Sequence, residues 1–275
     1  MSKIIDEKEL KERIEDYKSR PLKYFTEAEA YRFLLNCIDL TTLEGSDNKK
    51  KIDELCHKAL NYRDDAKHIP TTAAVCVYPP FVAQAKEILK GTGVNVAAVA
   101  GAFPAGQSPI EIKVAEVKYT AAAGADEIDM VISRGKFLEG NFEEVSNEIK
   151  AIKAACGSAH LKVILETGEL QSYTNIYKAS EIAIAAGADF IKTSTGKIKE
   201  NATPESFLTM LDALKDHYDA TGKIVGMKPA GGISDADTAI TYLKILENVL
   251  GEKWLTNKNF RIGASRLADR VWERC

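Results

Sequence analysis

The stretch AAGADEID (residues 122–129) recurs in the same register as AAGADFIK (residues 185–192). Each copy has the pattern of a helix end, a tight turn at glycine and the start of a buried strand. The repeat places Asp129 and Lys192 at equivalent positions, late in their strands. A chain that repeats this unit is expected to form a parallel sheet with crossover helices.

The same alternation of short β-type runs and helical segments continues outward from the repeat, from about residue 35 to the C-terminus. Eight runs are predicted as strands: LLNCIDL (34–40), TAAVCVY (72–78), VNVAAVA (94–100), DEIDMVI (126–132), LKVILE (161–166), ADFIKTS (188–194), KIVGMK (223–228) and NFRIGA (259–264). Helix starts between them show a capping hydroxyl followed by an acidic residue, at Ser108, Thr203 and Ser234. Eight strands without a linker favour a single α/β domain, a (β/α)₈ TIM barrel, over an open doubly wound sheet.

Residues 1–34 are predicted to be an N-terminal helical extension, and residues 35–275 the barrel. Two helices are expected in the extension, over residues 3–20 and 26–34, the second opened by a capping box at Thr26. They are expected to cover the bottom of the barrel or one flank. The alternative is a charged, partly disordered leader over residues 1–20.

The composition is that of a soluble globular protein, with 45% hydrophobic residues, 28% charged residues and a net charge of −3. It indicates no basic surface for nucleic acid. The charged start and the absence of a long apolar run indicate no signal peptide and no membrane span, so we expect a cytoplasmic protein.

The five cysteines and four histidines show no spacing typical of a metal site. No C-x-x-C, H-x-H or H-E-x-x-H pattern occurs. The cysteines are predicted to be reduced thiols, and a metal-dependent mechanism is disfavoured.

Two lysines and an aspartate are predicted to converge at the barrel mouth. Alternate strands of such a barrel contribute side chains to the same layer, so Asp129 and Lys192 are expected to point inward together. Alternation in KIVGMK puts Ile224, Gly226 and Lys228 on one side, with Gly226 leaving room beneath the lysine. A lysine amine reacts with a carbonyl only when neutral, and desolvation or a second lysine lowers its pKa. The group is therefore typical of Schiff-base chemistry, with a buried structural ion pair as the alternative.

The loops after the last two strands predict a phosphate site. They contain Gly231 and Gly232 in one loop and Gly263 and Ser265 in the other, with Arg266 adjacent. Glycines allow backbone N–H groups to approach an anion, and these loops are the frequent phosphate site of the fold. A P-loop or a dinucleotide fingerprint is not present in the sequence.

The chain closely resembles the deoxyribose-phosphate aldolase family from Cys37 to Leu267. The resemblance rests on these motifs: DLTTL (39–43), AAVCVYP (73–79), GADEID (124–129), ETGEL (166–170), GADFIKTSTGK (187–197), KPAGG (228–232) and GAS (263–265). It implies a class I aldolase on a (β/α)₈ barrel that cleaves 2-deoxy-D-ribose 5-phosphate to acetaldehyde and D-glyceraldehyde 3-phosphate, without metal or organic cofactor. A homodimer is implied by the resemblance alone.

The resemblance also implies roles for individual residues. Lys192 resembles the Schiff-base lysine, Lys228 the lysine that lowers its pKa, and Asp129 the aspartate of the proton relay. The implied substrate-binding residues are Asp39, Thr41, Cys76, Thr195 and Lys197. For Cys76, a small apolar barrel residue is an equally good interpretation.

The sequence departs from some family members at two places. Arg266 stands where some have a second serine, and the C-terminal tyrosine tail of some members is absent. Two alternatives to this aldolase remain: another Schiff-base barrel enzyme such as a transaldolase or keto-acid aldolase, and a sugar-phosphate-binding barrel without turnover.

Overall fold

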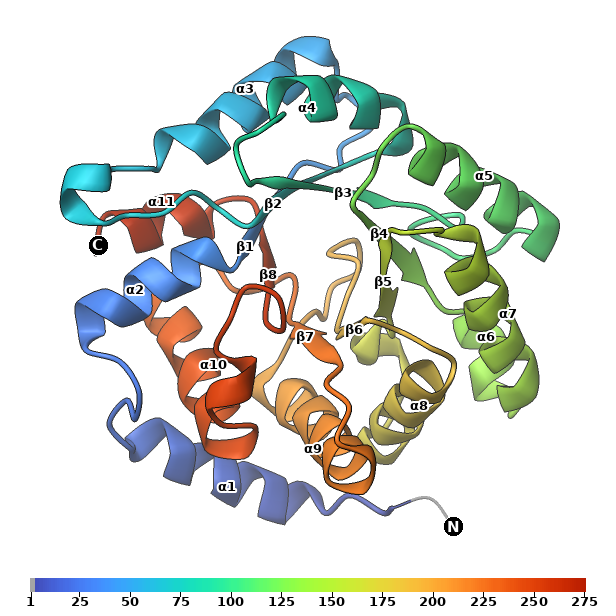
Figure 1. The fold of residues 1–275 in the computed structure, drawn as a ribbon. Helices are drawn as coiled ribbons and strands as arrows, with labels where there is room; N and C mark the ends of the chain where they lie inside the picture. The colour runs from blue at the N-terminus through green and yellow to red at the C-terminus, as the bar shows by residue number, and fades with distance from the viewer. Residues whose placement is uncertain (1–2) are drawn as a thin grey trace.

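Short runs of buried residues form eight parallel strands, which line a barrel inside a ring of helices (Figure 1). The computed structural model describes residues 3–275. The strands are β1 (Ile38–Thr41), β2 (Ala74–Val77), β3 (Asn95–Val99), β4 (Glu127–Val131), β5 (His160–Ile164), β6 (Phe190–Lys192), β7 (Gly226–Lys228) and β8 (Ile262–Ala264). Each predicted run overlaps one of them, so the predicted (β/α)₈ barrel is confirmed.

The strands pair in the order β7-β6-β5-β4-β3-β2-β1-β8, and two isolated parallel bridges, Met227 with Phe260 and Ala230 with Gly263, link the segments around β7 and β8. The helices are α1 (Glu7–Ser19), α2 (Glu27–Asn36), α3 (Lys49–Asn61), α4 (Val82–Ile88), α5 (Ile110–Ala122), α6 (Arg134–Leu138), α7 (Phe142–Ala155), α8 (Tyr173–Ala185), α9 (Pro204–Thr221), α10 (Ala236–Val249) and α11 (Leu267–Trp272). This topology brings the C-terminal ends of all eight strands to one mouth.

Seven of the eight predicted strands begin one to four residues before the observed strand, and two of these cases matter for the site. Residues 34–36 belong to helix α2, so the first strand starts only at Ile38. Ile224 lies before β7 and is 40% exposed, so the predicted inward alternation holds for Gly226 and Lys228 but not for Ile224. The proposed division of the chain at residues 34 and 35 stays a prediction, and it would fall within α2.

The helix starts agree only in part with the predicted caps. Thr26 forms the predicted capping box, and Thr203 caps α9 with Ser206 as its reciprocal partner. The cap of α10 is Asp235, one residue after the predicted Ser234. The cap predicted at Ser108 is wrong, because Pro109 holds that position in α5 without a side-chain hydrogen bond.

The N-terminal helices lie on the flank of the barrel. Helix α1 packs outside α9 and α10, where it buries Leu10 and Ile14 and where Arg13 forms two hydrogen bonds of 2.7 Å with Asp212 (Figure 1). Helix α2 packs against α10 and α11. The alternative of a partly disordered leader is therefore wrong for residues 7–19, while residues 1–2 lie outside the described part of the chain.

At Gly226 the barrel interior has no room for a side chain. A Cβ atom at Gly226 would lie 2.3 Å from Cε1 of Phe190, the residue paired with it on β6. The room predicted beneath Lys228 is therefore filled by the ring of Phe190. This close approach fixes β6 against β7 just below their two lysines.

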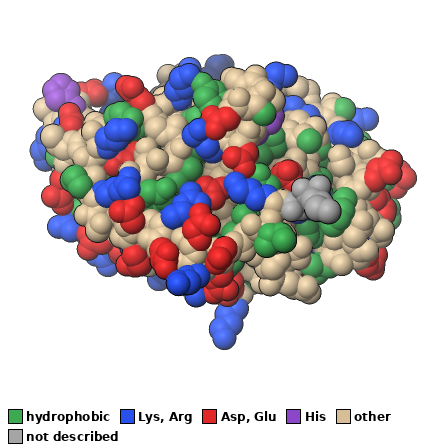
Figure 2. Space-filling view, turned by 90° about the horizontal axis from the view of Figure 1, so that it is seen from below, with side chains coloured by type: hydrophobic (Ala, Val, Ile, Leu, Met, Phe, Trp, Pro, Cys, Tyr) green, Lys and Arg blue, Asp and Glu red, His purple; other side chains and the backbone are tan. Residues whose placement is uncertain are grey.

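The surface carries interspersed charges. Acidic and basic side chains alternate on the face of the molecule seen in Figure 2. No helix among residues 3–275 is both long enough and apolar enough to span a bilayer.

Candidate active site

Asp129, Lys192 and Lys228 meet inside the mouth of the barrel. The Nζ atoms of both lysines donate hydrogen bonds to the same carboxylate oxygen of Asp129, Oδ2, each at 2.7 Å. Paired residues of neighbouring parallel strands point to the same side, and Lys192 pairs with Lys228 in the β6–β7 register. The repeat and the strand parity therefore place these three side chains correctly.

A second set of charged residues, which the sequence analysis did not single out, lies beneath the first. Lys162 of β5 donates to Oδ1 of Asp129 at 2.9 Å and forms an ion pair with Glu127 of β4. Arg261, just before β8, donates to Oε1 of Glu127 at 2.8 Å and to Oδ1 of Asp39 at 2.7 Å. Asp39 in turn accepts a 2.5 Å hydrogen bond from Lys228.

Strand parity offered a signal for this second set. Glu127 lies two residues before Asp129, and Arg261 two residues before Gly263, so each pair shares a strand face. Lys162 is paired with Asp129 across the β4–β5 register. Strand parity does not predict that Glu127, Arg261 and Lys162 contact one another, because those contacts form only when the barrel closes.

The complete network contains more basic than acidic groups. Its basic members are Lys162, Lys192, Lys228 and Arg261, and its acidic members are Asp39, Glu127 and Asp129. All are buried, with Lys192 3% exposed. Full ionisation would leave one uncompensated positive charge in a low-dielectric interior, so one basic group is expected to be neutral.

Lys192 is the group whose surroundings favour the neutral form. Burial is the larger cause of its lowered pKa, the positive charge of Lys228 adds to it, and Asp129 opposes it. Burial also acts on Lys228, but the carboxylates of Asp129 and Asp39 outweigh it and raise the pKa of Lys228. Neighbouring carboxylates likewise outweigh burial and raise the pKa of Lys162.

The carboxylates of the network stay ionised. Burial alone would raise the pKa of Asp129, but Lys162, Lys192 and Lys228 together lower it well below its ordinary value. The pKa values of Asp39 and Glu127 are lowered in the same way by their basic neighbours, against the effect of burial. These surroundings therefore favour a neutral amine at Lys192 beside an ionised Asp129 and a protonated Lys228.

A cavity of about 380 Å³ opens above Lys192. Of the predicted site residues it is lined by Thr41, Lys192, Thr195, Lys197, Gly231, Gly263 and Ser265. Asp129, Lys228 and Asp39 are fully buried and lie below it. Lys192 is thus the member of the network that reaches the cavity wall.

Two further predicted residues, besides the three that lie below, do not line this cavity. Cys76 is fully buried, and it packs in a small cluster with Leu43, Ala97 and Val99. Burial raises the pKa of the Cys76 thiol. Gly232 is also absent from the cavity wall, although its neighbour Gly231 forms part of it. Both glycines have positive φ, as the predicted turn requires.

One wall of the cavity is fixed by Glu166, which the sequence analysis quoted only as part of a motif. The Thr195 N–H donates to Glu166 Oε1 at 3.0 Å, and the Thr195 hydroxyl donates to Oε2 at 2.5 Å. Arg134 donates to Glu166 Oε2 at 3.1 Å. Lys197 lies further along the same loop, where its Nζ contacts Glu44 Oε1 at 3.0 Å.

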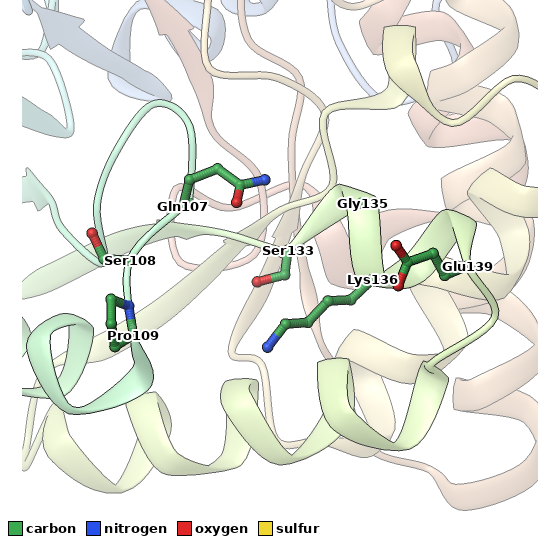
Figure 3. Close-up of a pocket in the computed structure, with 8 residues that line it drawn as sticks. Gln107, Ser108, Pro109, Ser133, Gly135, Lys136 and Glu139 are labelled. Atoms are coloured by element: carbon green, nitrogen blue, oxygen red, sulfur yellow. The ribbon is translucent and has the colours of Figure 1, made fainter.

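A larger cavity of about 490 Å³ lies outside the barrel, between the β3–α5 loop and α6 (Figure 3). None of the predicted site residues lines it. Within residues 3–275, no three His, Cys, Asp or Glu side chains are grouped as a metal ion would require.

A model of the DeoC/LacD family of aldolases matches residues 33–244. The chain belongs to the DeoC/LacD aldolase family. Relatives include the human protein named deoxyribose-phosphate aldolase, with 48% identity over 247 residues that cover 85% of this chain and 77% of that protein. The bovine protein of the same name is 46% identical over 261 residues, which cover 90% and 81%.

Solved structures of aldolases have the same fold. The aldolase QR15 aligns with a TM-score of 0.72 and 31% identity, covering 88% of this chain and 96% of that one. The deoxyribose phosphate aldolase of Aeropyrum pernix, described as tetrameric, aligns with a TM-score of 0.71, covering 98% and 97%. Its identity is 24%, so this likeness concerns the fold alone.

Proposed function

We propose that the chain is a class I aldolase that reversibly cleaves 2-deoxy-D-ribose 5-phosphate to acetaldehyde and D-glyceraldehyde 3-phosphate. The observation that carries the proposal is the position of Lys192. It lies at the floor of the cavity, and its surroundings favour a neutral amine. Membership in an aldolase family and relatives named for this activity support the substrate.

In the proposed first step, the Lys192 amine adds to the aldehyde carbon C1 of the open-chain sugar. A proton delivered to the carbinolamine hydroxyl then lets it leave as water, which gives an iminium ion. Lys228 stays protonated and disfavours a proton on Lys192, which favours the free amine. Asp129 lies between both amines and is placed to move protons, directly or through a water.

In the proposed cleavage step, a base removes the proton of the C3 hydroxyl while the C2–C3 bond breaks. The bonding electrons move into the iminium, which gives an enamine on Lys192 and releases glyceraldehyde 3-phosphate. Protonation of the enamine at C2 and addition of water then release acetaldehyde and restore the amine. Every atom is accounted for without a cofactor.

The rest of the cavity is proposed to hold the substrate. Gly231, Gly232, Gly263 and Ser265 are proposed to bind the phosphate, since they lie at the end of β8 and in the segments that follow β7 and β8. Thr41, Thr195 and Lys197 are proposed to contact the sugar hydroxyls or the phosphate from the cavity wall. Asp39 lies below the cavity and is proposed to affect the site through its hydrogen bond to Lys228. Cys76 is proposed to support the site by packing in its cluster. A homodimer and a cytoplasmic location stay predictions.

The test is product analysis with the wild-type protein and with one variant, Lys192→Ala. The wild-type protein should convert 2-deoxy-D-ribose 5-phosphate to acetaldehyde and glyceraldehyde 3-phosphate, and Lys192→Ala should abolish this while the circular dichroism spectrum stays unchanged. Products from a ketone donor instead would identify another Schiff-base aldolase or a transaldolase. Saturable substrate binding without turnover, unchanged in Lys192→Ala, would identify a binding protein.

A further inference from the structure

Glu127 and Arg261 form a charged pair across the barrel, below the proposed reacting groups. Glu127 is fully satisfied there: Asn95 donates to its Oε1 at 2.8 Å, Arg261 donates at 2.8 Å, and Lys162 forms an ion pair with it. Both side chains are buried, and neither lines the cavity above Lys192. Neither can therefore touch a substrate held in that cavity.

Each member of this pair reaches Asp129 through other charged groups. Glu127 holds Lys162, which donates to Oδ1 of Asp129. Arg261 holds Asp39, which accepts from Lys228, and Lys228 donates to Oδ2 of Asp129. The pair therefore acts on both oxygens of the carboxylate that Lys192 contacts.

We propose that Glu127 and Arg261 are positioning residues. Together they set how many protons the buried charged network holds, and so whether Lys192 carries one. Their opposite charges cancel, which leaves Asp39 and Asp129 to be balanced by Lys162 and Lys228. The network is then neutral when Lys192 is neutral. This inference rests on the proposed function, because it assigns a purpose to the free amine of Lys192.

The surroundings of Lys192 determine the sign of the expected effects. Asp129, Lys228 and Cys76 act on it most directly. Lys162 reaches Lys192 through Asp129, and Asp39 reaches it through Lys228. Lys197 and Glu44 are on the cavity wall. Cys76 stays a neutral thiol because burial raises its pKa. Changes at Glu127 or Arg261 leave all these groups in place.

Glu127→Gln removes one negative charge and keeps the shape of the side chain. The excess positive charge should keep the Lys192 amine neutral to a lower pH. Arg261→Gln removes one positive charge, so Lys192 should hold its proton to a higher pH. The double variant restores the balance and should behave like the wild type. A shift on the order of one pH unit is expected for one charge in such a buried network.

The experiment measures how fast acetaldehyde and cyanoborohydride form a reduced adduct on Lys192 in the intact protein, over a series of pH values on the acid side. The midpoint of the acid limb should move down for Glu127→Gln, up for Arg261→Gln, and return in the double variant. Shifts in the same direction, unchanged midpoints, or no return in the double variant would each overturn the inference.

A matched control tests whether any buried carboxylate has this effect. Glu148 is also buried, and it forms a hydrogen-bonded cluster with Lys113 and with Ser133, which lines the cavity of Figure 3. Glu148→Gln makes the same change of charge outside the network, so its midpoint should equal that of the wild type. An equal shift in this control would contradict the inference. If wild-type protein forms no adduct at Lys192, the proposed function itself fails.

Discussion

Lys192 and Lys228 are the same residue type at paired positions, yet their surroundings push their pKa values in opposite directions. Lys228 is fully buried and contacts two carboxylates, those of Asp39 and Asp129. Lys192 contacts only Asp129 and borders the cavity. This difference in partners, rather than the residue type, makes one lysine a candidate nucleophile and the other a fixed cation.

Removing the charge of Lys228 should therefore impair catalysis in a pH-dependent way. In Lys228→Met the positive charge that disfavours protonated Lys192 is lost, so the pKa of Lys192 rises and less neutral amine is present at a given pH. We expect a loss of activity at neutral pH of about 10²- to 10³-fold. The acid limb of the pH–rate profile should move to higher pH.

Lys113→Met provides the comparison for this variant. Lys113 is equally buried but belongs to the separate cluster with Ser133 and Glu148. Its variant should keep the wild-type position of the acid limb. An acid limb that stays in place in Lys228→Met, with the protein folded, would contradict the role assigned to Lys228.

At the scale of elements, the contact between β6 and β7 depends on Gly226. A methyl group there would overlap the ring of Phe190, so Gly226→Ala should lower the free energy of unfolding by about 1–3 kcal/mol, as overpacking does. Chemical denaturation measures this loss, and the added substitution Phe190→Leu should recover part of it. Gly45→Ala is the control, because nothing lies within 4 Å of that added Cβ. Equal stabilities of the two alanine variants would refute the packing argument.

The elements also show what the sequence could predict. Strand alternation and the repeat placed Asp129, Lys192 and Lys228 correctly, because both are local patterns. Lys162 and Arg261 were missed because strand parity indicates which side of the sheet a residue faces, but not which residues of other strands it contacts across the barrel. The failed cap at Ser108 and the exposed Ile224 have the same origin, since local patterns do not show where the chain must turn.

At the scale of the whole molecule, the N-terminal helix contributes to stability and lies apart from the proposed chemistry. Helix α1 packs on the outside of α9 and α10, whereas the charged network lies within the barrel (Figure 1). Leu10→Ala should lower the free energy of unfolding by about 2–5 kcal/mol, the usual range for a buried leucine, and leave kcat unchanged. Urea unfolding and steady-state kinetics measure the two effects.

The exposed residue Lys8 of the same helix supplies the control for this prediction, and Lys8→Ala should change neither quantity. A fall in kcat in folded Leu10→Ala would show that α1 is coupled to the active site. In that case the separation between flank and barrel interior would be wrong.

The most direct test of the account is the identity of the amine that forms the imine. The protein is incubated with acetaldehyde and borohydride, its intact mass is measured, and the modified peptide is mapped. The account predicts one added ethyl group, on Lys192, and none on Lys228 or Lys162. An adduct on another lysine, or no adduct on the folded protein, would contradict it.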